Sequence, residues 1–315
     1  SSHQVVGNID YGTGRLTFRR AINPTGDSVF SNYQYSSENS DASFVQIGNG
    51  GYASGTGGRN SAGHTGEIQV TAAGDIRFHG GAAFGSYAQI GHGGYDAASR
   101  HGAQTDGADL TVDRSGNITV SAGGIVEFLA GRGIHINEQR QYAMLGHGGY
   151  NTDGHHQGIL SVTAGTGAMS LAPGVVGGGA SAGVVFTSGV TLDAFSQMGH
   201  GGADAQSARE DGDTGRRGFT GSITVNTPGD IRFTAGTGAF STNAVLGATT
   251  DWNDIRAYTQ LGHGGIGSYT RNDSNTTTLY TSEIGHNGNI TVNSTGGSVL
   301  FQGGDTAFGS PGAGF

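Results

Sequence analysis

Two short motifs alternate from one end of the chain to the other, and this repetition constrains the fold more than any other feature. The first motif opens on glycine, alternates apolar and polar residues as Ile-x-Val, and reaches a second glycine seven to nine residues later. It then alternates again as Ile-x-Phe, and its clearest copy is 221–233. A period of two residues is that of a β-strand, so each copy predicts a strand, a turn and a second strand.

Six copies of this motif align on their opening glycines, and the apolar positions of both strands keep one register. The opening glycines are Gly7, Gly66, Gly116, Gly158, Gly221 and Gly288. In the fourth copy the alternation places Met169 and Leu171 in the second strand. The last apolar positions of the second strands are therefore expected to form one ladder, made of Phe18, Phe78, Phe128, Leu171, Phe233 and Phe301.

The second motif is an aromatic residue, three further strand-like residues and a glycine turn, usually written Gly-His-Gly-Gly. Its five copies occupy 44–51, 87–94, 142–149, 195–202 and 258–265. Each copy predicts a third short strand that ends at the glycines, so that one cycle of the chain contains three strands.

A single three-strand coil cannot bury its Ile and Phe side chains, but stacked coils can, because each strand then pairs with its equivalents above and below. The sequence therefore predicts an all-β, three-faced parallel solenoid with long irregular loops. We expect one domain, 1–315, of about five to six imperfect coils. Loops such as 203–220 and 266–287 are expected to leave the stacked core, because loop closure costs little extra entropy as length grows.

Composition limits the function classes. The chain contains 63 glycines, no cysteine and no lysine, and its net charge is −9. The acidic balance disfavours nucleic-acid binding, and no apolar run is long enough to predict membrane insertion. No motif predicts a cofactor.

The strings Gly-Asn-Ile-Thr-Val at 116–120 and 288–292 and Gly-Asp-Ile-Arg-Phe at 74–78 and 229–233 resemble the repeats of filamentous-haemagglutinin-like exoproteins. Proteins of that family are large secreted adhesins of Gram-negative bacteria. The resemblance covers most of the chain and implies a right-handed β-helix. It also implies an extracellular or outer cell-surface location in a Gram-negative-type bacterium.

The histidines of the second motif are expected to stack in one column, with Asn49 in the fifth position; they are His92, His147, His200 and His263. One interpretation is a metal column or a pH sensor. The favoured interpretation is a ladder of neutral side chains bonded to backbone carbonyls, because no acid or second histidine keeps a fixed offset from all four. No metal site is predicted, and acid is expected to weaken the stack.

Carboxylates on the outward side of the second strand raise the possibility of an enzyme. Asp75, Glu127 and Asp230 lie at or beside this side, near Arg77 and Arg232. Some β-helix enzymes use outward carboxylates on neighbouring coils for glycoside chemistry. A solvated face with weak charge pairs is the favoured interpretation, because the motif repeats where a catalytic site should be unique.

The last copy of the first motif is not followed by a third strand, so the terminal coils are expected to present open strand edges. The sequence predicts a structural filament or adhesin subunit that assembles head to tail with its own copies, the N-terminal strand of one filling the open end of the next. A segment of a longer polypeptide is the alternative. The predicted polymerisation interface consists of Ser2, His3, Gln4, Val5, Val6, Ile9, Val299, Phe301 and Phe308.

The competing function is a carbohydrate-active β-helix enzyme or a tailspike-like polysaccharide-binding protein. We do not expect an enzyme, because the repeats are equivalent and no coil carries a distinct catalytic cluster in the sequence. Host or matrix polysaccharide remains a further candidate partner of the fibre.

Overall fold

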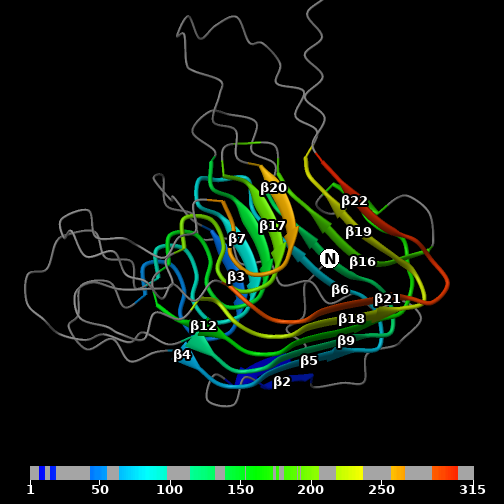
Figure 1. The fold of residues 1–315 in the computed structure, drawn as a ribbon, viewed down its shortest axis with the longest axis horizontal. Coiled ribbons are helices and arrows are strands. Elements are labelled where there is room, and N and C mark those ends of the chain that lie inside the picture. Colours follow the sequence, from blue (N-terminus) through cyan, green and yellow to red (C-terminus); the bar gives the residue numbers. More distant parts are fainter. Residues whose placement is uncertain are drawn as a thin grey trace, which may run out of the picture.

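The computed structural model describes residues 7–10, 15–18, 43–54, 64–97, 114–131, 139–152, 154–172, 175–176, 181–189, 191, 193–205, 218–236, 257–266 and 286–303. Every regular element within these ranges is a β-strand. Most strands pair in parallel into three five-stranded sheets (Figure 1). The prediction of an all-β protein with stacked parallel strands is confirmed.

The first sheet contains the first strands of the repeats in an unbroken register. Its order is β5 (Ile68–Ala72), β9 (Ile118–Ala122), β13 (Leu160–Ala164), β18 (Ile223–Thr227) and β21 (Ile290–Ser294). The second sheet follows in the same direction, with the order β6 (Ile76–His79), β10 (Val126–Leu129), β16 (Ala182–Thr187), β19 (Asp230–Thr234) and β22 (Val299–Gln302).

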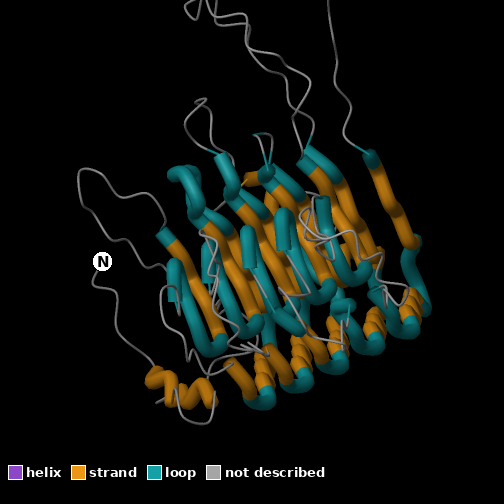
Figure 2. Tube along the Cα trace, turned by 60° about the vertical axis from the view of Figure 1, so that its left-hand side comes forward, coloured by secondary structure: helices purple, strands orange, loops and turns teal. Residues whose placement is uncertain are grey.

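The third sheet contains the strands that precede the glycine turns: β3 (Phe44–Ile47), β7 (Tyr87–Ile90), β11 (Tyr142–Leu145), β17 (Phe195–Met198) and β20 (Tyr258–Leu261). A small fourth sheet is formed by β4 (His64–Thr65), β8 (Arg114–Ser115) and β12 (His156–Gln157). We call one first-sheet, one second-sheet and one third-sheet strand in chain order a coil. Figure 2 shows the coils side by side along the stack.

The main core lies between the three sheets, because alternate residues of every strand point inward. Aromatic rings of the second sheet stack through this core with centroids 4.8–5.3 Å apart, in the order Phe78, Phe128, Phe186, Phe233 and Phe301. A second aromatic cluster lies on the other side of the third sheet, where Phe44, Tyr87, Tyr142, Phe195 and Tyr258 stack at 4.7–5.2 Å.

Glycine is required at the corners because the backbones of neighbouring coils turn there while only one strand spacing apart. Gly91 and Gly146 have φ values of 154° and 150°, in a region that side chains rarely occupy. A Cβ atom at Gly91 would also collide with the backbone carbonyl of Gly146 in the next coil. The repeated glycines therefore set how closely the coils stack.

The predicted second strand of the fourth repeat is wrong. Leu171 lies in β14 (Ser170–Ala172), which pairs antiparallel with β15 (Val175–Val176) outside the three sheets. The place in the second sheet is taken by β16, whose Phe186 is fully buried. Both segments alternate apolar residues, but β16 supplies the aromatic ring that continues the stack between Phe128 and Phe233.

The first repeat also differs from the prediction. Its strands, β1 (Gly7–Asp10) and β2 (Arg15–Phe18), pair with each other in an antiparallel hairpin, and Phe18 pairs with Gly7. They do not extend the parallel sheets, although β2 contacts β5. Only four residues separate the two strands in the sequence, so they can satisfy each other's hydrogen bonds locally.

The aromatic stack makes a stability prediction. Phe186→Ala should lower the free energy of unfolding by about 3–5 kcal/mol, because a buried ring is replaced by a cavity. Phe301→Ala is the matched control, since the same ladder position is 55% exposed on β22 and should cost far less. Urea unfolding of dilute protein measures both changes, and equal losses would contradict the assignment of β16 to the ladder.

Candidate functional site

The predicted histidine column exists. The rings of His92, His147, His200 and His263 stack with centroids 4.8–5.0 Å apart and planes within 9° of parallel. Each ring follows a third-sheet strand, and the glycines around it let the turn repeat at the same height in every coil.

The Nε2 atom of each ring bonds a backbone carbonyl at the beginning of the same coil. His92 contacts the carbonyl oxygen of Gly66 at 2.9 Å, and His147 contacts that of Gly116 at 2.8 Å. The same bond recurs from His200 to Gly158 and from His263 to Gly221. The histidine therefore ties the end of a coil's third strand to the start of its first strand.

The Nδ1 atom of each ring accepts the backbone N–H of the preceding member of the column. His92 accepts from Asn49 at 2.9 Å, and each later ring accepts from the histidine before it at 3.0 Å. Because Nδ1 accepts a hydrogen bond, Nε2 carries the ring proton and donates a hydrogen bond to the glycine carbonyl. Both ring nitrogens are used, and the geometry requires neutral imidazoles.

Burial agrees with this protonation state. It is the main cause that lowers the pKa of His92, His147 and His263, and it lowers the pKa of His200 to about 3. Among the residues that the structure describes, no three His, Cys, Asp or Glu side chains come together as metal ligands would. With both nitrogens already bonded, the column has no free electron pair to offer a metal ion.

Glutamine side chains form a second polar column that the sequence analysis missed. Gln89 Nε2 donates to the carbonyls of Gly146 and Gly148 in the next coil at 3.0 and 3.1 Å. Gln46 and Gln197 make equivalent bonds to the glycines of the coils that follow them. The sequence does contain a pattern that predicts this column. A glutamine recurs two residues before the first glycine of the turn, and Met144 replaces this glutamine in one coil.

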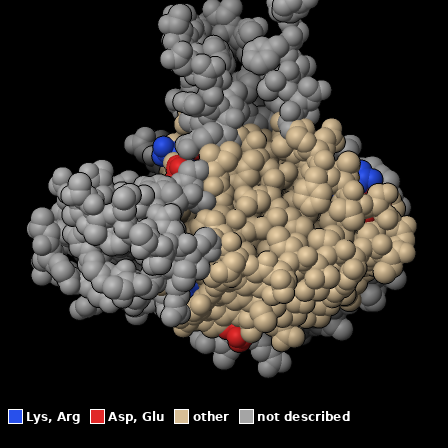
Figure 3. All heavy atoms as spheres, in the orientation of Figure 1, with Lys and Arg blue, Asp and Glu red and all other residues tan. Residues whose placement is uncertain are grey.

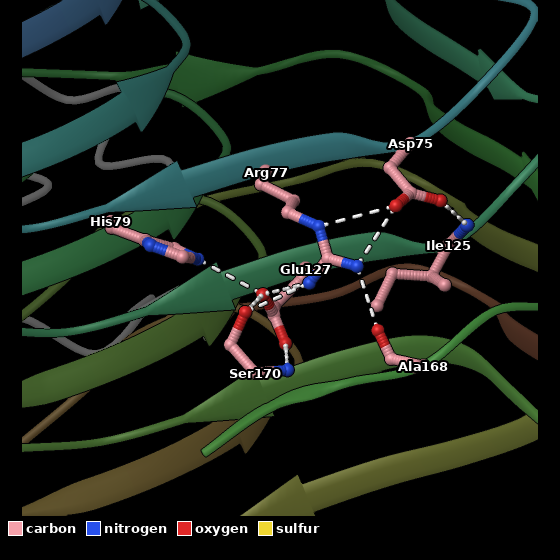
Figure 4. Close-up of polar contacts among 7 residues, drawn as sticks. All are labelled: Asp75, Arg77, His79, Ile125, Glu127, Ala168 and Ser170. Atoms are coloured by element: carbon pink, nitrogen blue, oxygen red, sulfur yellow. Dashed lines mark hydrogen bonds and ion pairs between the residues drawn. The ribbon is translucent and has the colours of Figure 1, made fainter. Parts of the chain in front are cut away.

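An ion-pair cluster covers the outer face of the second sheet (Figure 4). Glu127 Oε2 lies 2.7 Å from Arg77 NH1 and 2.9 Å from His79 Nε2. Ser170 donates to Glu127 through its backbone N–H and its hydroxyl, both at 2.7 Å. Arg77 also bonds Asp75, so one guanidinium connects two carboxylates.

This cluster corrects the prediction of a solvated face. Glu127 is 1% exposed, and the segment around Ser170 covers it. Burial alone would raise the pKa of Glu127, but hydrogen bonds from His79 and Ser170 and the charge of Arg77 outweigh it and lower the pKa to about 2. The carboxylate is thus ionised and fully bonded, and it fastens the inserted segment to the sheet.

The remaining predicted carboxylate makes a simpler contact. Asp230 lies 2.6 Å from Arg232, whose side chain is 36% exposed, and it also accepts the backbone N–H of Ser298. The structure therefore does not bring Asp75, Glu127 and Asp230 together in one group.

The predicted polymerisation residues fall into three groups. Val299 and Phe301 lie on β22, the outermost strand of the second sheet, and are 48% and 55% exposed. Ile9 lies in the β1–β2 hairpin. The other members lie outside the described residues; they are Ser2, His3, Gln4, Val5, Val6 and Phe308.

No protein-family model, curated protein or solved structure matches this chain. Within its described part, no helix is long and apolar enough to span a membrane. Function must therefore be inferred from the chain's own geometry.

The histidine column predicts loss of stability in acid. An imidazole in the unfolded chain has a pKa of about 6.5, whereas the folded column keeps its rings neutral at lower pH. Below about pH 6.5 the unfolded chain therefore binds more protons than the folded protein. Each such ring lowers the free energy of unfolding by up to about 1.4 kcal/mol per pH unit. For His200 the loss runs from about pH 6.5 down to its folded pKa of about 3. A melting temperature that stays flat between about pH 7.5 and 5, where imidazoles titrate, would contradict this prediction.

A control variant separates the column from other titrating groups. His200→Asn keeps one donor and one acceptor but removes the proton-binding ring. The pH dependence of its melting temperature over the same range should therefore be shallower than that of the unaltered protein.

The ion-pair cluster predicts a strong effect of charge removal. Glu127→Gln keeps the shape but leaves the buried Arg77 with only Asp75 as a counterion, and should cost about 3–5 kcal/mol in urea unfolding at pH 7. Asp230→Asn is the control and should cost much less, because its arginine partner is partly exposed. Similar losses in both variants would contradict the assigned role of Glu127.

Proposed function

We propose that this protein is a structural subunit of an extracellular filament or adhesive fibre, built as a closed, right-handed, three-faced solenoid. The bond from each histidine to the glycine that opens its coil supports closure of the coil. The resemblance of its repeats to secreted adhesins supports the handedness and a place on the outer surface of a Gram-negative-type bacterium.

The observation that carries this proposal is the exposed edge of the coil formed by β21 and β22, the last one that the structure describes. Val299, Leu300 and Phe301 on β22 are 40–55% exposed, and Ile290 on β21 is 47% exposed. The equivalent Phe233 in the preceding coil is fully buried. Burying one large apolar side chain contributes about 1.5–3 kcal/mol, so an additional layer of strands on this edge would be strongly stabilised.

The partner best suited to this edge is another copy of the same chain. Every coil presents the same inward ladder of Ile, Val, Leu and Phe, so a coil of identical sequence matches the edge in spacing and shape. Polysaccharide of the host or matrix is a further candidate partner for the fibre's sides and loops.

A carbohydrate-active enzyme is the competing function, and the Glu127 cluster is its best support. Two features argue against it. The carboxylate is buried beneath the segment around Ser170, and its low pKa leaves no proton for a general acid at neutral pH.

Electron microscopy of negatively stained protein at neutral pH tests the proposal. Long uniform filaments are expected, and Phe301→Asp should prevent them by placing a charge on the apolar edge. Thr163→Asp, on the exposed outer face of a middle coil, is the control and should leave filaments intact. Monodisperse short rods in the unaltered sample would overturn the proposal.

Removal of residues 1–6 distinguishes two ways of joining. Filaments should vanish if the N-terminal strand fills the open end of the next copy. They should persist if complete sheets stack on one another.

A further inference from the structure

The two ends of the stack are incomplete in complementary ways. At one end, β21 and β22 begin a coil for which the described part of the chain supplies no third strand, and β20 is the edge of the third sheet. At the other end, β3 extends the third sheet beyond β7, and the described residues place no first-sheet or second-sheet strand in its layer. Among the described strands, the end with β21 and β22 therefore lacks the one strand that the opposite end presents.

We propose that β3 of one copy completes the coil begun by β21 and β22 of another, which fixes the register of a head-to-tail junction. This inference rests on the proposed self-assembly and names the strands that meet. In the junction β20 pairs with β3 of the next copy, while β21 pairs with its β5 and β22 with its β6.

The histidine column supplies the first argument. Each member's backbone N–H donates to the next ring, but in the described chain no ring follows His263 to accept its N–H. At the other end stands Asn49, whose amide offers one acceptor and one donor as a neutral imidazole does. Its Nδ2 already donates to the Thr65 carbonyl at 3.2 Å, beside the glycine that His92 contacts.

In the junction, Asn49 takes the place of the next imidazole. Its Oδ1 accepts the His263 N–H of the neighbouring copy, and its Nδ2 turns to the carbonyl of Gly288, the glycine that opens the shared coil. This explains why an amide rather than a fifth histidine can occupy the end of the column.

The glutamine column continues in the same register. Gln260 bonds the carbonyl of His263 in its own turn, and the junction offers it the carbonyls of Gly48 and Gly50, which match the glycines contacted by Gln197.

Charge does not oppose the junction. The end of the stack over β21 and β22 shows no Asp, Glu, Lys or Arg except at its margins (Figure 3). A chain of net charge −9 would otherwise repel its own copies at close range.

The β1–β2 hairpin must leave its position for the first sheet to continue. β2 contacts β5, and Ile68 on β5 is 3% exposed whereas Ile290 on β21 is 47% exposed. The hairpin thus lies against β5, at the end that docks onto β21 and β22 of another copy, whereas β21 and β22 themselves are exposed among the described residues.

Engineered cysteines test the register in the full chain, which has no cysteine of its own. Thr71 and Asn293 hold equivalent places in β5 and β21, both exposed, at opposite ends of the first sheet. The double variant Thr71→Cys with Asn293→Cys should form reducible dimers, trimers and longer chains under mild oxidation, because adjacent strands bring the Cα atoms within about 4.4–6.8 Å.

The offset control is Thr71→Cys with Thr291→Cys, two residues out of register, in which the Cα atoms lie too far apart for a disulfide. It should remain monomeric on a non-reducing gel. Equal cross-linking of both pairs would overturn the inference. Filaments by microscopy without cross-linking of the matched pair would overturn the register but leave the proposed assembly standing, and absence of both would overturn the two together.

Asn49 variants give an independent readout. Asn49→His should preserve filament length, because imidazole supplies the same donor and acceptor, whereas Asn49→Leu should shorten filaments severalfold. Equal filament lengths in both variants would show that the column does not continue across the junction.

Discussion

Backbone hydrogen bonding between parallel strands holds the coils at a single spacing of about 4.8 Å, and the other features of the structure follow from this constraint. Equivalent side chains of neighbouring coils are therefore in contact, so aromatic rings stack face to face and each histidine ring stacks on another histidine ring. Only residues that tolerate such contacts can occupy a ladder. Neutral imidazole does so by accepting on one side and donating on the other, and glycine does so by removing the side chain at the corners.

The strands and their inward faces were predictable from the sequence because a period of two and the repeated glycines carry that information directly. The pairs Ile118 with Leu160 and Phe128 with Phe78 lie in the predicted register. The histidine column was predictable for the same reason, since equal positions in stacked repeats must meet. The donor and acceptor roles of its nitrogens required the backbone positions.

Two kinds of feature could not be predicted from the sequence. One is which of two similar segments enters a sheet, and the other is which residues an inserted segment buries. Leu171 and Phe186 both end alternating stretches, and only packing between two existing rings selects Phe186. The first repeat has the right pattern but pairs with itself. Glu127 looks like a surface residue in its strand, because the chain that covers it at Ser170 comes from 43 residues further along.

Met144 interrupts the column of glutamine side chains. It takes the place of a glutamine, so no amide from this coil reaches the carbonyls of Gly199 and Gly201. Gln197, which pairs beside it, reaches only its own turn and the coil ahead. The column of glutamine bonds is therefore interrupted between β11 and β17, where the backbone ladder, two stacked ring pairs and the hydrogen bond from Thr191 to Gln141 hold the layer instead.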